Sequence, residues 1–302
     1  MAELTPWQRR QQRLARLTQL EEPEPAPAAT LEQPQPEPQP EPPEPAPAPA
    51  PEPAPEPEPE LPMPRVFACS DLHVDYRENM RWVEAISDRS FRGDALLIAG
   101  DVTDDLEKLK DTLRLLKTKF AHVFYLPGNH DLWIRGGLKK WNVGPISPLT
   151  PPLPPPANSL VKLEQILTMC DEIGVYTSPR RLRGVWVVPL LAWYHAGFDT
   201  EPDISGWEGI PPIEDALMDY QLVKFPAGVS ARKGDDTAAK HFDVLNERLA
   251  ETALRSLGGQ PGADSLAAGD VTWSQRLHAQ ITADRRASDS HGVISFSHFL
   301  PR

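Results

Sequence analysis

Residues 95–104 read ALLIAGDVTD and join a short apolar run to the polar residues that follow it. Its first five residues are all apolar and too few for a helix, so they predict a buried strand over residues 95–99. The strand is followed directly by Gly100 and Asp101, which places a carboxylate at its carboxyl end. In α/β proteins, ligands bind beyond that end of the strands. Asp101 is therefore a candidate site residue.

Two other segments repeat this pattern of a short apolar run followed by metal-capable groups. The run VFAC precedes one pair of such groups, and the run VFYL precedes another. These runs predict strands over 66–69 and 123–126, followed by Asp71 and His73 and by Asn129 and His130, respectively. Because the carboxyl ends of parallel strands meet at one edge of a sheet, we expect the three sets of polar groups to lie close together.

The segments between these strands have the periodicity of helices. Apolar residues recur every three or four positions over residues 106–120 and define one apolar stripe. A shorter helix is predicted over 79–86 with Asn79 as its N-cap, and another from residue 160 to a stop at Gly174. Strands that alternate with helices indicate a parallel α/β sheet.

The C-terminal half continues the alternation with longer interruptions. A strand is predicted over 185–192 and a helix over 242–253. Residues 258–290 are small, polar and irregular, so we expect a loop or an insert there. A last strand over 293–296 is followed by His298, which adds a fourth metal-capable strand end.

Proline and glutamate are concentrated near the N-terminus and divide the chain. Of the 36 prolines, 19 fall in residues 21–64. Such a segment cannot bury a core and favours an extended, disordered spacer. We therefore expect a short Arg-rich amphipathic helix over 1–22, a disordered linker over 23–64 and one folded domain over 65–302, with a Pro-rich insert at 143–157.

Composition excludes several classes of function. The net charge of −12 comes mostly from the glutamates of the linker, and the folded part is not basic, so no nucleic-acid footprint is expected. No apolar run approaches the ~18 residues of a membrane span. Cys69 and Cys170 are too few for a disulfide framework. We expect a cytoplasmic protein, with organelle targeting through the N-terminus as the alternative. A linker role for 23–64 is favoured over binding to a Pro-recognising partner.

The polar strand ends form three motifs, D-x-H at 71–73, G-D-x-x-D at 100–104 and G-N-H-D at 128–131, with the lone His298 after them. In this order they resemble the calcineurin-like metallophosphoesterases, over residues 65–302. The surrounding sequence is similar to a little-characterised plant and algal branch. The resemblance implies a four-layer α/β/β/α sandwich and hydrolysis of a phosphomonoester or phosphodiester by hydroxide activated at a dinuclear metal centre.

The resemblance also implies a ligand set for two divalent or trivalent cations. Asp71, His73 and Asp101 would hold the first cation, and Asp101, Asn129 and His298 would hold the second. Such ions clamp a phosphate ester and ionise water. The mixed oxygen and nitrogen donors suit Mn, Fe or Zn better than Ca.

By the same resemblance, His130 is a general acid that protonates the leaving alkoxide, rather than a metal ligand. Asp104 occupies the place of a carboxylate that orients this imidazole. Capping of the following helix by Asp104 or Asp105 is an equally good interpretation. One branch of protein phosphatases has an arginine where this chain has Asp105, so close kinship with that branch is not expected.

The family's last motif, G-H-x-H, is missing, since no His-x-His occurs among the 302 residues. We therefore expect a domain that is incomplete at its C-terminus, with each metal site one imidazole short. Three hypotheses follow: a di-metal phosphoesterase, which we favour; an inactive binding or scaffold protein with the same fold; and a tether whose Pro/Glu segment is the working part.

Overall fold

The computed structural model describes residues 63–135, 155–202, 206, 208–232, 234–257, 271–287 and 292–301. The predicted N-terminal helix lies outside these residues, as do nearly all of the predicted linker and most of the predicted insert at 143–157. The described chain forms an α/β fold built on two three-stranded sheets.

The first sheet contains the three strands that carry the sequence motifs. Its order is β1 (Val66–Cys69), β2 (Ala95–Ala99) and β3 (His122–Leu126), and all neighbours are parallel. All three predicted strands are thus confirmed, and their carboxyl ends lie at one edge.

The second sheet joins β4 (Arg180–Leu182), β5 (Val185–Pro189) and β6 (Gly292–Phe296). β4 is antiparallel to β5, and β6 is parallel to it. β5 ends earlier than predicted because the backbone N–H of Leu191 donates to the side chain of Asn246 at 2.9 Å instead of extending a strand ladder.

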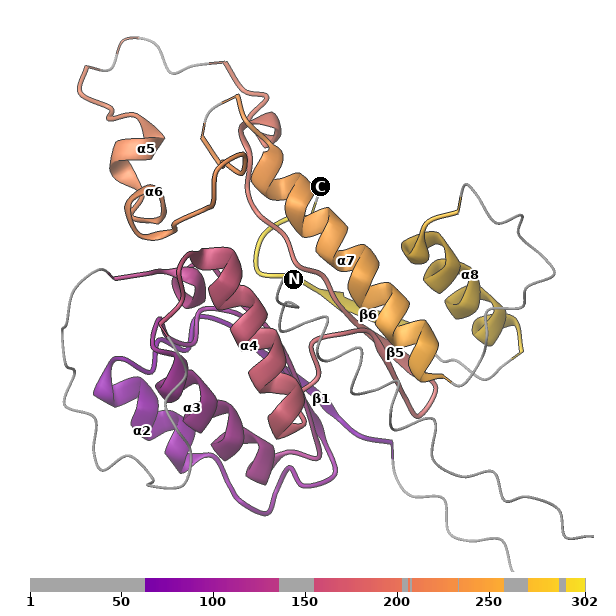
Figure 1. The fold of residues 1–302 in the computed structure, drawn as a ribbon. Helices are drawn as coiled ribbons and strands as arrows, with labels where there is room; N and C mark the ends of the chain where they lie inside the picture. Colours follow the sequence, from indigo (N-terminus) through magenta and orange to yellow (C-terminus); the bar gives the residue numbers. More distant parts are fainter. Residues whose placement is uncertain are drawn as a thin grey trace, which may run out of the picture.

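Helices cover the outer faces of both sheets (Figure 1). The first sheet packs against α2 (Arg77–Ala85), α3 (Leu106–Lys119) and α4 (Ser159–Ile173), and the second packs against α7 (Thr237–Ser256) and α8 (Trp273–Arg286). Buried side chains from both sheets form a separate cluster between them. The layer order is therefore α/β/β/α, as the resemblance implied.

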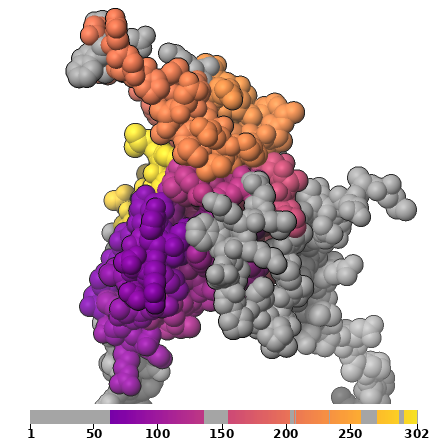
Figure 2. All heavy atoms as spheres, turned by 90° about the vertical axis from the view of Figure 1, so that its left-hand side faces the viewer, coloured from indigo at the N-terminus to yellow at the C-terminus, as the bar shows by residue number. Residues whose placement is uncertain are grey.

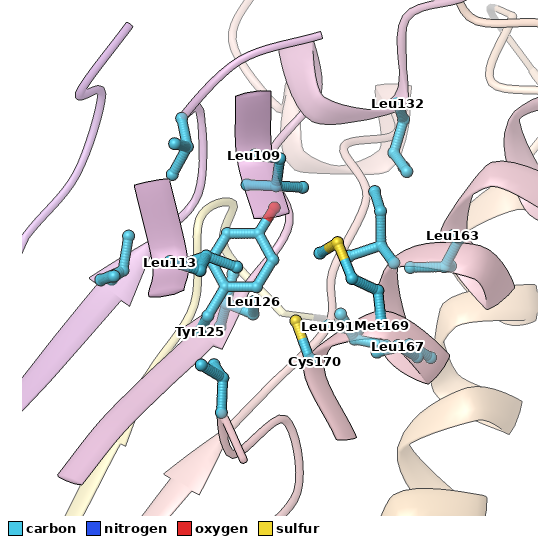
Figure 3. Close-up of a cluster of buried hydrophobic side chains, with 14 of the residues drawn as sticks. Leu109, Leu113, Tyr125, Leu126, Leu132, Leu163, Leu167, Met169, Cys170 and Leu191 are labelled. Atoms are coloured by element: carbon cyan, nitrogen blue, oxygen red, sulfur yellow. The ribbon is translucent and has the colours of Figure 1, made fainter. Parts of the chain in front are cut away.

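Alternation along the strands explains the layers. Leu96 and Ile98 of β2 belong to the core under the helices, whereas Ala95 and Leu97 belong to the cluster between the sheets. A strand buried on both faces is continuously apolar, as the sequence ALLIA is. Figure 3 shows the helix side of the first sheet, where leucines of α3 and apolar side chains of α4 surround Tyr125 of β3.

Two predictions for helices are wrong. The helix predicted from Asn79 begins at Arg77, and Asn79 instead donates to the backbone carbonyls of Leu72 and His73 at 2.8 and 3.2 Å. The segment 258–290, predicted to be an irregular loop or an insert, contains the regular helix α8. Its N-terminus is closed by a capping box between Thr272 and Gln275, a local signal that the small, polar composition of this segment concealed.

Between β5 and α7 the chain forms short helices that the sequence did not predict, α5 (Ile213–Ala216) and α6 (Asp219–Leu222). The part around α5 projects from the body of the molecule (Figure 2). α6 brings Asp219 back to the edge where the strands of the first sheet end. No helix in the described part of the chain combines the length and the apolar character needed to cross a membrane.

Candidate metal centre

The turns after β1 and β2 have an unusual backbone conformation. Asp71 and Asp101, each just beyond a strand, have left-handed φ values of 56°, and His73 has a φ of 41°. Such values are costly for residues other than glycine and persist where surrounding contacts enforce them. Here the two turns are joined, because the N–H groups of Asp71 and His73 donate to the carbonyls of Gly100 and Asp101, both at 3.0 Å.

Two glycines let the strand ends approach closely. A Cβ atom on Gly128 would lie 2.2 Å from Oδ1 of Asp101 and 2.8 Å from Cε1 of His298. One on Gly100 would lie 2.4 Å from the backbone nitrogen of Gly128. Both motif glycines are therefore required to bring the two turns and His298 together.

Asp131 holds the turns after β2 and β3 in place by hydrogen bonds to their backbone. Its fully buried carboxylate accepts four backbone N–H groups at 2.8–3.0 Å, and those donors are Asp101, Val102, Thr103 and Gly128. The sequence placed Asp131 in a motif but gave it no role. Its position is recognisable only when the turns after β2 and β3 are seen side by side.

Three of the predicted ligands, Asp101, Asn129 and His298, bring polar atoms close together. His298 Nδ1 lies 2.7 Å from the carbonyl oxygen of Ala99, which can only accept, so Nδ1 carries the proton. In the neutral imidazole, Nε2 then presents a lone pair. It faces Oδ1 of Asn129 at 2.9 Å and Oδ1 of Asp101 at 3.5 Å.

This arrangement fits a cation. Two neighbouring ligands of one transition-metal ion, each about 2.1 Å from it, lie roughly 3 Å apart. The oxygen of Asn129 and the nitrogen of His298 have this separation. The donor set of Asp101, Asn129 and His298 therefore suits the second predicted metal site.

The first predicted site also includes Asp101. Nε2 of His73 is 3.7 Å from Oδ1 of Asp71. Ligand atoms of His73, Asp101 and His130 all lie within 4.8 Å of one another. Asp71 is exposed, whereas Asp101 is buried. The carboxylate of Asp71 also accepts a hydrogen bond from the hydroxyl of Ser70. Asp101 thus lies close to potential ligands of both predicted sites.

Burial makes the central carboxylate unusual. Asp101 is 3% exposed, and burial raises its pKa to about 6, with the charge of Asp131 adding to the increase and His298 opposing it. A cation bound at this carboxylate would favour its ionised form. A bound metal ion would therefore offset the cost of burying the ionised carboxylate of Asp101.

His130 packs between aromatic rings beside Asp101. Its ring stacks on Trp133 with centroids 3.6 Å apart and meets His73 edge-on at 4.7 Å. Burial lowers the pKa of His130, and the neighbouring His73 lowers it further. The backbone N–H of His130 donates to Oδ1 of Asp101 at 2.9 Å, so the imidazole is fixed at the edge of the cluster.

Asp104 has a different partner from the one the resemblance implied. Its carboxylate pairs with Arg135, and within the described ranges no hydrogen bond joins it to His130. The buried Lys162 donates to the carbonyls of Asp104 and Trp133 at 2.6 and 2.7 Å. Of the two capping candidates, Asp105 caps α3 by accepting the N–H of Lys108 at 2.9 Å.

Asp219 is a site residue that the sequence did not single out. It is 6% exposed, and its Oδ1 accepts from the amide of Asn129 at 2.8 Å. It lies in no motif and no periodic segment, and it is separated from Asn129 by 90 positions. Only the tertiary structure connects the two.

Comparisons relate this chain to known proteins. The family model described as calcineurin-like phosphoesterase matches residues 64–215. The [acyl-carrier-protein] phosphodiesterase PptH of Mycobacterium tuberculosis is 30% identical over 155 residues, which is 49% of this chain and 43% of that protein. The chain thus matches less than half the length of this relative.

A solved structure, that of phosphopantetheinyl hydrolase (PptH) from Mycobacterium tuberculosis, aligns over 80% of this chain and 84% of its own. It has 22% sequence identity and a TM-score of 0.44. The family match includes the three motifs, whereas Asp219 and His298 lie beyond it and are connected to the site by their contacts.

Proposed function

Since this chain belongs to the calcineurin-like phosphoesterase family, we propose that it is a metal-dependent hydrolase that cleaves a phosphodiester. The observation that supports the proposal is the convergence of three side chains, Asp101, Asn129 and His298, each of which can offer an oxygen or nitrogen atom to a cation. Such a mixed set of oxygen and nitrogen donors matches the ligands that transition-metal ions take in proteins.

We assign two metal sites that share Asp101. Asp71 and His73 complete the first site, and Asn129 and His298 complete the second. The 3.5 Å approach of Asp101 Oδ1 to His298 supports its place in the second site, and the proximity of its ligand atoms to His73 supports its place in the first. When bound, the two cations would supply Lewis acidity and a hydroxide nucleophile. Mn, Fe and Zn fit the donors.

The chain's own residues have separable tasks in this proposal. Asp131 and the two glycines hold the turns so that the ligands stay in place. His130 is held beside the cluster by its stack on Trp133 and donates a proton to the departing alkoxide. General-acid assistance of this kind contributes roughly 10²–10⁴ in rate.

The relative that matches this chain is named as a phosphodiesterase of acyl-carrier protein, which favours a diester over a monoester here. We propose a protein-linked phosphodiester as the first substrate to examine. An acyl-carrier protein that carries a phosphopantetheine group tests it directly. The synthetic diester bis(4-nitrophenyl) phosphate and the monoester 4-nitrophenyl phosphate test the bond type without the protein.

The decisive experiment is hydrolysis by the full chain after metal removal and reloading with Mn²⁺. We expect Mn²⁺-dependent cleavage, faster for the diester than for the monoester, and its loss in Asp101→Asn. Asp111→Asn, an exposed change on α3, is the matched control and should keep the activity. Tight Mn²⁺ binding with no hydrolysis of any substrate would instead identify a binding protein with a phosphoesterase fold.

A further inference from the structure

Asp219 is held by three donors from different parts of the fold. Its Oδ1 accepts from Asn129 Nδ2 at 2.8 Å and from the indole N–H of Trp133 at 2.6 Å. Its Oδ2 accepts from the hydroxyl of Tyr194, beyond β5, at 3.2 Å. A buried carboxylate with three donors has a fixed position and a fixed rotation.

This carboxylate determines which way the amide of Asn129 faces. A carboxylate oxygen only accepts, so the NH₂ group of Asn129 must face Asp219. The amide oxygen is then directed to the opposite side, toward His298 and Asp101. With the amide reversed, the NH₂ group would face the cation position and could not serve as a ligand.

We propose that Asp219 is a positioning residue of the metal centre, which presents the Asn129 oxygen to the second cation and secures the ring that supports His130. The inference rests on the proposed function. It concerns a residue outside the three motifs and outside the family match, on the short α6 helix.

The second part of this role runs through Trp133. The same Oδ1 atom that holds Asn129 holds the Trp133 indole, and the indole stacks on His130 at 3.6 Å. One oxygen therefore fixes both a metal ligand and the platform of the candidate general acid. A loss of Asp219 would release both groups together.

A purely structural role is the alternative, because buried donors without an acceptor destabilise a fold. Metal affinity separates the two interpretations, since the loss of an outer partner of a ligand typically costs 10–100-fold in metal affinity. Asp94 is the matched control. It is also an acid that is 6% exposed, and it pairs with Arg65 at the opposite end of β2 from the metal centre.

The test is calorimetric titration of the full, metal-free chain with Mn²⁺. We expect Asp219→Ala to weaken one of two Mn²⁺ sites about 10–100-fold while the other site stays within about threefold. Asp219→Asn should restore the affinity, because its amide oxygen accepts both bonds and its NH₂ group faces the Tyr194 hydroxyl. Asp94→Ala should lower the melting temperature and leave both sites unchanged.

Asp219→Ser leaves room for a water molecule to satisfy the freed donors, and it replaces the alanine variant if that one does not fold. Wild-type affinity at both sites in Asp219→Ala or Asp219→Ser would overturn this proposal alone. Equal weakening by Asp219→Asn and Asp219→Ala would also overturn it, since the orientation of the amide would not be the cause. A wild-type chain that binds no Mn²⁺ would overturn the proposed function as well.

Discussion

Asp131 holds the backbone of Asp101 in place, with its Oδ2 atom 2.8 Å from the Asp101 nitrogen. Each carboxylate oxygen of Asp131 accepts two backbone N–H groups, so one side chain fixes the turns after β2 and β3. The left-handed conformation of Asp101 is thereby stabilised, and Asp131 fixes the position from which the Asp101 side chain extends.

The first prediction concerns this buried carboxylate. Asp131→Asn places an NH₂ group against two backbone N–H groups whichever way the amide turns. We expect it to lower the free energy of unfolding by about 3 kcal/mol or more, since charged hydrogen bonds are lost and donors are left unpaired. Urea denaturation measures the change, with Asp111→Asn as the control. A loss below ~1 kcal/mol would contradict the role given to Asp131.

The second prediction concerns the close approach at Gly128. Gly128→Ala places a methyl group 2.2 Å from Oδ1 of Asp101 and 2.8 Å from its backbone nitrogen. We expect a loss of about 1–3 kcal/mol in stability and weaker Mn²⁺ binding, because the strand ends must separate. Gly93→Ala is the matched control, since a Cβ there meets nothing within 4 Å. Equal effects of the two substitutions would refute the packing argument.

The third prediction concerns pH. Because burial raises the Asp101 pKa from 3.8 to about 6, the folded, metal-free chain keeps a proton that the unfolded chain has lost in this range. Raising the pH from about 4 to 6 should therefore lower the unfolding free energy, by at most about 3 kcal/mol from this residue. Asp101→Asn removes the effect.

Denaturation in the presence of a chelator at both ends of that pH range tests the third prediction. The variant should be more stable than the wild type near neutral pH, and the difference should shrink in acid. A difference that is the same at both pH values would show that Asp101 does not titrate in this range.

The fourth prediction concerns His130 and the leaving group. Phosphodiesters with a good leaving group, such as 4-nitrophenolate, need little protonation, whereas alkyl or phenyl esters need it strongly. We expect His130→Ala to slow an unactivated diester by roughly 10²–10⁴ and a nitrophenyl diester far less. The measurement is kcat for a series of leaving groups. A uniform loss across the series would assign His130 to metal or substrate binding instead.

The sequence predicted the elements in which local pattern and tertiary environment agree. The strands of the first sheet and the helices α3 and α4 carry strong periodicity and clear caps, and all were located to within a few residues. The sequence does not predict α8 because its residues are mostly polar and its apolar stripe is weak. The strand β4 was missed because it is only three residues long and gains its register from β5.

The residues of the candidate site also differ in whether the sequence alone can predict them. Residues in the three motifs could be named in advance because each follows a recognisable strand. The roles of Asp131 and Asp219 could not, because they depend on contacts between turns that are distant in sequence. Asn129 and Asp219 lie 90 residues apart, with no pattern in the intervening chain to join them.

The central claim is that the carboxylate of Asp101 is shared by two cations. The most direct measurement is the number of Mn²⁺ ions bound per chain, for the wild type and for three variants. We predict two ions for the wild type, one each for His73→Ala and His298→Ala, and none held tightly by Asp101→Asn. A wild-type chain that binds no ion, or an Asp101→Asn variant that still binds two, would contradict the claim.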